Sequence, residues 1–408
     1  EKVREGMEKK GLDGALVAQV LELDEKRREL LKEVENLRAE RNEISEGAGK
    51  PSRKQIERAT EIKETLQELE PELKKIEKQF ETKLFQLPNL PAEDVPFGKD
   101  EKDNVEMKTW GEPTSFSFKP KSYWDLGETL GIIDTERAAK VSGSRFGYLK
   151  SQAVFLEFAL VQLALEKLRK EGFTPIVSPV MIGEEAMRGM GYLEHGGEEE
   201  TYHFKKDNLY LVGTSEQAVG PMHMNETLAE EDLPLRYVSF STCFRREAGS
   251  YGRDTKGIFR VHQFDKLEMF SFAKPEQSDK EHEFLLSLQE ELMQELNIPY
   301  QVTKMCTGDL GNPAARKYDI NAWFPAQSCY RETHSTSTCT DFQARRLNIK
   351  YRQSGDRESA FVHTLNGTAF AVGRTLLAIL ENYQQEDGSV KVPEALQNFV
   401  GRELICKR

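Results

Sequence analysis

A seven-residue repeat of apolar side chains near the start of the chain constrains its fold more than any other sequence feature. The repeat consists of Leu16, Leu23, Leu30, Leu37 and Ile44, with Val20 and Val34 at the alternate positions of the seam. A seam of this period is buried when it packs along a second helix. The first part of the chain is therefore expected to form a long helix with a helical partner.

A second apolar run supplies that partner within the same chain. Its members alternate spacings of four and three residues: Ile62, Leu66, Leu69, Leu73, Ile76 and Phe80. Between the runs lies GAGKPS, residues 47–52, where glycines can end one helix and Pro51 can open the next. We expect an antiparallel hairpin over residues 1–86, about 45 Å long at about 1.5 Å per residue, with Pro71 kinking or dividing its second helix.

The hairpin has two possible uses on this pattern, dimerisation as a coiled coil and contact with a nucleic acid. Residues 12–86 contain 15 Lys and Arg against 18 Asp and Glu, so the hairpin as a whole is not basic. Basic side chains nevertheless gather around the turn, which is a weak signal for phosphate contact. They are Arg38, Arg41, Lys50, Arg53, Lys54 and Arg58.

Composition narrows the class of protein. The net charge of −12 argues against a protein that coats nucleic acid non-specifically, because such binding depends on phosphate neutralisation. Neither a membrane-spanning run nor the apolar core of a signal peptide is present in the sequence, so a cytoplasmic location is expected. The five cysteines form no CxxC pair, and we expect neither a disulfide framework nor a zinc site.

The rest of the chain reads as an α+β domain. Leu87–Pro96 holds three prolines, and residues 87–110 are expected to be a linker before a domain over 111–408. In that domain the patterns predict helices at 152–170, 279–296 and 366–383, and strands at 173–180, 209–212, 237–246 and 259–272.

The stretch CFRREAGSYGRDTKGIFRVHQFDKLEMF, residues 243–270, is the most informative. If both ends are strands, Arg245 and Glu247 share one face. The same holds on the second strand for Arg260, His262, Phe264, Lys266 and Glu268. Such a row is costly to bury without ligands, which favours a site for a polyanion. A solvated hairpin with cross-strand ion pairs is the alternative that the pattern leaves open.

This stretch resembles motif 2 of class II aminoacyl-tRNA synthetases, in the form found in seryl-tRNA synthetases. Pro179 in FTPIVSPVM resembles the motif 1 proline, and LNGTAFAVGRTLLAILEN, with Arg374, resembles motif 3. Thr214-Ser215-Glu216 is similar to the serine-binding T-x-E element of that family, and CTDFQARR is typical of it. The resemblance covers the whole chain and implies a helical hairpin followed by a catalytic domain with a mainly antiparallel sheet flanked by helices.

The resemblance also implies roles for individual residues. Arg245, Glu268 and Arg374 would be catalytic, and ATP and Mg²⁺ would be required. The serine-binding set would be Thr214, Glu216, Arg245, Glu268, Asn366 and Thr368. The ATP-binding set would be Arg245, Arg246, Glu247, Arg260, Val261, Phe264, Glu332, Thr333, His334, Ser335 and Arg374, with Glu332 and Ser335 holding the Mg²⁺ ion.

The same resemblance implies a homodimer that charges tRNA(Ser), and it leaves open whether tRNA(Sec) is charged as well. Two departures from the family pattern stand out: His334 lies beside the expected metal position, and the loop at 189–204 is unusual. Two other functions compete with the synthetase. A ligase that charges a carrier protein would typically lack the hairpin, and a catalytically silent paralogue should have lost Arg245, Arg260 and Arg374, all of which are present.

Overall fold

The computed structural model describes residues 1–46, 52–248, 252, 254, 256–352, 355 and 357–407. The chain divides into two compact units, Glu1–Pro88 and Asn89–Arg408. Among the described helices, none is both long and apolar enough to cross a membrane.

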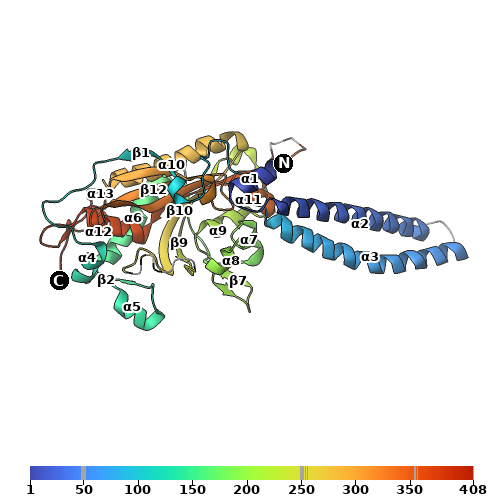
Figure 1. Ribbon diagram of the computed structural model, residues 1–408, viewed down its shortest axis with the longest axis horizontal. Coiled ribbons are helices and arrows are strands. Elements are labelled where there is room, and N and C mark those ends of the chain that lie inside the picture. Colours follow the sequence, from blue (N-terminus) through green and yellow to red (C-terminus); the bar gives the residue numbers. More distant parts are fainter. Residues whose placement is uncertain are drawn as a thin grey trace. The chain divides into compact units, whose positions relative to one another are not determined.

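The first unit is a pair of long helices with a short helix before them (Figure 1). Helix α1 spans Lys2–Lys9, α2 spans Ala15–Glu46 and α3 spans Arg53–Phe85. The predicted turn, including Lys50, lies outside the described residues, but the start of α3 is well defined. The Ser52 side chain accepts from the Gln55 backbone N–H and the Gln55 side chain accepts from the Ser52 N–H, so the two form a capping box.

The predicted seam is the core of this unit. Val34, Ile62, Leu66 and Leu73 are buried, and Leu30, Leu37, Ile44 and Leu69 pack against them. Pro71 does not divide the helix, because α3 continues on both sides of it. A proline removes one backbone N–H, and the side-chain seam on either side holds the helix together.

The second unit is built on one large sheet. The strand order is β1-β11-β12-β13-β16-β10-β9-β4, and the neighbours are antiparallel except for β4 and β9. The strands are β1 (Val105–Trp110), β4 (Thr174–Val177), β9 (Leu235–Phe244), β10 (Gln263–Ala273), β11 (Tyr300–Lys304), β12 (Arg316–Phe324), β13 (Cys329–Thr338) and β16 (His363–Ala371).

One face of this sheet is covered by helices α6 (Gln152–Lys170), α10 (Ser278–Glu295) and α12 (Val372–Asn382), all of which are labelled in Figure 1. Their apolar side chains share one cluster with Leu267 and Met269 of β10. Because side chains alternate along a strand, Phe264, Lys266 and Glu268 point to the opposite face. That face carries the site described below.

Short elements complete the second unit. The helices are α4 (Tyr123–Thr129), α5 (Thr135–Ser142), α7 (Glu184–Gly189), α8 (Gly197–Glu200), α9 (Glu216–Val219), α11 (Phe342–Leu347) and α13 (Glu394–Val400). The strands are β2 (Ile133–Asp134), β3 (Tyr148–Leu149), β5 (Met181–Gly183), β6 (His203–Phe204), β7 (Leu209–Leu211), β8 (Thr227–Ala229), β14 (Lys350–Arg352), β15 (Ala360–Phe361), β17 (Val390–Lys391) and β18 (Leu404–Ile405).

The expected linker over 87–110 differs from the structure at its end. Val105–Trp110 is the edge strand β1, paired with β11. The proline-containing part also packs on the second unit, because Val95 lies against Met305 and Leu310. The Asp94 carboxylate also accepts from Lys304 Nζ at 2.6 Å. The proline spacing indicated an extended backbone, but it carried no signal for the contacts made at long range.

The predicted helices at 152–170 and 279–296 are confirmed to within one residue at each end. The predicted helix at 366–383 is wrong over its first third, because residues up to Ala371 belong to β16. This strand is hydrogen-bonded to β10 on one side and to β13 on the other, and that pairing overrides local propensity. Arg374 therefore lies in the first turn of α12, not in the middle of a long helix.

The seam of the first unit yields a prediction about local stability. Ile62 is fully buried, whereas Ile56, six residues earlier on the same helix, is 54% exposed. Ile62→Ala should lower the free energy of opening the hairpin by about 2–5 kcal/mol, and Ile56→Ala by much less. Hydrogen exchange of α3 amides in the full chain measures both values. Equal effects of the two substitutions would contradict a seam that packs through Ile62.

Candidate active site

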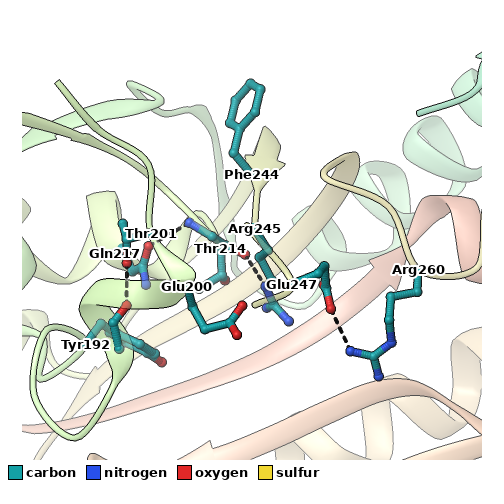
Figure 2. A pocket seen from close by; sticks show the side chains of 11 residues that line it. Tyr192, Glu200, Thr201, Thr214, Gln217, Phe244, Arg245, Glu247 and Arg260 are labelled. Atoms are coloured by element: carbon teal, nitrogen blue, oxygen red, sulfur yellow. Dashed lines mark hydrogen bonds and ion pairs between the residues drawn. The ribbon is translucent and has the colours of Figure 1, made fainter. Parts of the chain in front are cut away.

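Two cavities open on the polar face of the large sheet. The larger has a volume of about 460 Å³ and the smaller about 70 Å³. Arg245, Glu247 and Arg260 line both, so the cavities adjoin along these side chains. Figure 2 shows Arg245 between Thr214 and Glu247, with a contact joining Glu247 to Arg260.

Arg245 and Glu247 follow the end of β9, so the expectation that they share a strand face is wrong. Arg245 Nε donates to the Gly213 carbonyl at 3.0 Å, and its guanidinium lies 5.4 Å from the centre of the Phe264 ring. Glu247 has a φ of 53°, in the left-handed region. Its carboxylate meets Arg260 Nη1 at 2.6 Å.

Arg260 and Val261 also precede their expected strand, since β10 begins at Gln263. Both nevertheless line the smaller cavity. These side chains therefore come from the irregular connection between β9 and β10 and not from an alternating row along the strands. Only Phe264, Lys266 and Glu268 obey the predicted alternation.

A bulge in β13 decides which residues of the segment Glu332–Ser335 face the smaller cavity. The register with β12 shifts between Ile320, which pairs with His334, and Asn321, which pairs with Glu332. The extra residue is Thr333, and a bulge of this kind reverses the facing of the side chains beyond it. As a result Glu332, Thr333 and Ser335 all line the cavity.

His334 is an exception to the predicted ATP-binding set. It is buried, its ring lies 5.8 Å from that of Phe370, and its Nδ1 is 2.8 Å from the Thr333 hydroxyl. Burial lowers the pKa of His334 to about 4. The side chain belongs to the packed interior and does not line either cavity.

Arg374 faces Glu332 across the smaller cavity. The Nη1 of Arg374 lies 3.3 Å from the Glu332 carboxylate, and its guanidinium stacks 4.8 Å from the centre of Phe259. Burial alone would raise the pKa of Glu332, but the charges of Arg374, Lys317 and Arg245 lower it to about 2.

Two buried carboxylates lie behind the cavity walls. Glu216, at the start of α9, accepts a hydrogen bond from the Tyr192 hydroxyl. Glu268 forms an ion pair with Lys266 and accepts from the Thr368 hydroxyl at 3.4 Å. Burial raises the pKa of Glu268 to about 7, although the charge of Lys266 acts in the opposite direction. Tyr192, Lys266 and Thr368 line the cavities in front of these carboxylates.

Register explains why Glu268 and Thr368 meet. They are paired residues on β10 and β16, although 100 positions separate them. Thr214 lines the larger cavity, and its buried hydroxyl has no hydrogen-bond partner among the described residues. Because an unsatisfied buried hydroxyl is costly, Thr214 is a group that a ligand would satisfy.

Two further predicted residues lie near the cavities without lining them. Arg246 lies 6.0 Å from the centre of the Tyr202 ring. Asn366 is buried, with its Nδ2 3.9 Å from Cys339 Sγ. Sequence reasoning in turn missed Tyr192, Thr201 and Gln217, and it gave no role to Lys266. Tyr192 and Thr201 lie in the atypical 189–204 loop, where no motif could flag them, whereas the predicted alternation had placed Lys266 on the site face.

The basic residues of the hairpin are largely paired within the first unit. Arg38 meets Glu70 at 2.7 Å, Arg58 meets Glu40 at 2.7 Å and Arg53 meets Glu57 at 3.0 Å. Arg41 and Lys54 are exposed on α2 and α3. The predicted patch is therefore a mixed surface in which several cations already have carboxylate partners.

Glu332 and Ser335 offer hard oxygen donors to a cation at the smaller cavity, beside the groups that could hold phosphates. This donor set fits Mg²⁺, which commonly takes few protein ligands and completes its shell with phosphates and water. Among the described residues, no cluster of three or more His, Cys, Asp or Glu side chains could hold a metal by itself.

Comparison with known proteins first gives the class. Residues 202–383 match the family model described as the tRNA synthetase class II core domain (G, H, P, S and T), so the second unit contains a class II synthetase core. Residues 1–91 match the model of the seryl-tRNA synthetase N-terminal domain.

Whole-chain comparisons give the family. The chain is 49% identical over 387 residues to a serine–tRNA ligase of Dictyoglomus turgidum, covering 94% of this chain and 91% of the relative. It is 43% identical to that of Rubrobacter xylanophilus, covering 99% and 96%. A crystal structure of seryl-tRNA synthetase from Pyrococcus horikoshii complexed with ATP superposes with a TM-score of 0.92 at 43% identity, covering 100% of this chain and 97% of that one. The chain belongs to the seryl-tRNA synthetase family, which favours the synthetase over the carrier-protein ligase and the silent paralogue.

Proposed function

We propose that this chain activates L-serine with ATP, releasing pyrophosphate, and then transfers serine from seryl-adenylate to tRNA(Ser). The activity is that of a serine–tRNA ligase of class II, as the family membership indicates. The observation that carries the proposal is the meeting of two unlike cavities at Arg245. One is lined by cations suited to phosphates, and the other leads to hydroxyls and carboxylates suited to a small amino acid.

The smaller cavity would take the ATP. Arg245 would contact the α-phosphate and the serine carboxylate, while Arg260 and Arg374 would hold the γ-phosphate end. Glu247 would accept from the adenine amino group, with Phe264 stacked on the ring. To do so, ATP must replace the present Arg260–Glu247 and Arg374–Glu332 pairs, whose side chains line this cavity.

Serine would lie where the larger cavity meets the smaller one at Arg245. The Thr214 hydroxyl lines the larger cavity and the Thr368 hydroxyl lines the smaller one. Together with the carboxylates of Glu216 and Glu268 they would surround the ammonium and the side-chain hydroxyl. All four side chains are buried, which is where hydrogen bonds discriminate best between ligands with and without a hydroxyl. His334, Arg246 and Asn366 would act on these ligands only through the residues they pack against.

Catalysis in this site would be electrostatic. A serine carboxylate oxygen attacks the α-phosphorus as the bond to pyrophosphate breaks, and negative charge grows on the phosphate oxygens. Arg245 stabilises that charge without giving up its proton. A bound Mg²⁺ would supply Lewis-acid charge neutralisation at the phosphates, with Glu332 and Ser335 as its protein ligands.

The helical hairpin would bind the tRNA, and the protein would act as a homodimer. The dimer is supported by apolar side chains on α6 and β4 that are left uncovered: Phe155, Phe158 and Val177 are 57%, 60% and 81% exposed. Serine-dependent exchange of pyrophosphate into ATP, with other amino acids as controls, tests the whole assignment. Aminoacylation of tRNA(Ser) and tRNA(Sec) transcripts then separates the two tRNA substrates.

Arg245→Ala should depress serine-dependent pyrophosphate exchange by about 10² or more, because it removes charge stabilisation at the α-phosphate. The fold should be unaffected, since Arg245 follows the end of β9 and lines open cavities. Arg402→Ala is the matched control, because this arginine is exposed near the end of the chain and lines neither cavity. Preserved exchange in Arg245→Ala would withdraw the role given to this arginine.

Replacing Leu12–Gln86 by a short linker should leave pyrophosphate exchange largely intact and abolish aminoacylation, because the hairpin is assigned only to tRNA. Both rates are measured on the same preparation, so exchange serves as the control for folding of the second unit. Aminoacylation with an unchanged KM for tRNA would instead make the hairpin a dimerisation or structural element.

Thr368→Ala should lower kcat/KM for serine and narrow the serine-to-threonine ratio, because it removes one hydroxyl partner and opens space for a methyl group. Glu268→Ala should be worse, since it also removes a carboxylate assigned to the substrate ammonium. Pyrophosphate exchange with serine, threonine and alanine measures both variants. If selectivity is unchanged in each, the hydroxyl is read elsewhere in the protein.

A further inference from the structure

Three cations of the site face are each paired with a carboxylate. Arg260 pairs with Glu247, Arg374 with Glu332, and Lys266 with Glu268. In the first two pairs both members have a role toward ATP under the proposed function. When ATP binds, each arginine would exchange its carboxylate partner for the phosphates of the ligand. In the third pair only Glu268 has a role, and Lys266 is unassigned.

The place of Lys266 on β10 indicates what it would meet. It lies two residues from Phe264, assigned to the adenine, and two residues from Glu268, assigned to the serine ammonium. Each step is roughly 7 Å along the strand, and all three side chains point to the same face. Lys266 therefore lies between the two substrates, where the serine carboxylate and the α-phosphate must come together.

The surroundings agree with that position. Lys266 lines the smaller cavity together with Arg245, Ser335 and Thr368, whereas Glu268 does not line it. The side chains of Lys266 and Glu268 are only 8% and 2% exposed. Lys266 thus stands between Glu268 and the cavity, and serine can reach Glu268 only if the lysine ammonium moves away.

A buried ion pair is weak support for a purely structural role, because well-packed apolar residues of similar size often stabilise a fold as well or better. In this pair the lysine ammonium can take the place of the substrate ammonium on Glu268. A lysine ammonium has the same charge and donor geometry as the α-ammonium of an amino acid, so it can satisfy Glu268 until serine arrives.

We propose that Lys266 occupies the position of the substrate ammonium on Glu268 and is released by serine to become a second catalytic cation beside Arg245. This inference rests on the proposed function. In the reaction a serine carboxylate oxygen bonds to the α-phosphorus and the bond to pyrophosphate breaks. Lys266 keeps its proton throughout and stabilises the charge that grows on the α-phosphate oxygens.

The first test measures kcat of pyrophosphate exchange and KM for serine separately in a Lys266 variant. Lys266→Met should lower kcat of serine-dependent pyrophosphate exchange by about 10², with the KM for serine unchanged or lower because a competitor for Glu268 is gone. Lys274→Met is the matched control. This lysine directly follows β10 and pairs with Glu230 at 2.9 Å, but it does not line either cavity. Its kinetics should equal those of the unmodified chain.

A second test uses the unmodified chain and does not depend on a variant that folds. Reductive methylation of Lys266, followed by mass spectrometry, should rise severalfold when serine alone is added and fall again when a non-hydrolysable ATP analogue is added with it. Lys274 should be methylated equally in every case.

The outcomes are distinct. A raised serine KM with unchanged kcat in Lys266→Met, or methylation that ignores serine, would overturn the proposal and leave Lys266 as part of the pocket wall. Absence of serine-dependent exchange in the unmodified chain would instead refute the proposed function. Exchange in the unmodified chain, together with the expected split in Lys266→Met and the serine-dependent labelling, would support both.

Discussion

The pairing of β10 with β16 is the constraint on which the rest of the second unit depends. Hydrogen bonds on both sides hold these central strands in one register, and that register brings Glu268 to Thr368. One face of β10 is sealed by apolar side chains shared with α6, α10 and α12. Because alternation leaves no other place for them, the polar side chains of the strand must gather on the opposite face.

Gathering charges on a half-buried face has an energetic consequence. Each carboxylate in the site carries a desolvation cost, and the structure offsets it by pairing the carboxylate with a cation or a hydroxyl. Glu247, Glu332 and Glu268 each meet a different cation. Under the proposed function these cations would exchange their carboxylate partners for the ligands, which would enter an environment whose charges are already oriented.

The first unit obeys the same rules with a different outcome. Its buried seam is apolar, and its charges lie on the solvent side, where pairs such as Arg58–Glu40 add little stability. If the hairpin binds tRNA as proposed, phosphate oxygens would have to compete with these carboxylates for the arginines.

The sequence by itself determined the helical hairpin, its seam and the two long helices α6 and α10 of the second unit, because periodicity is a local signal. It failed where long-range pairing decides the outcome. Asn366 to Ala371 became a strand between two others, and Val105 to Trp110 joined the edge of the sheet. Only the tertiary structure decided that the bulge at Thr333 turns His334 away from the cavity and that Lys266 covers Glu268. Register, bulges and buried ion pairs depend on residues far apart in the chain, and no local pattern encodes which of them will meet.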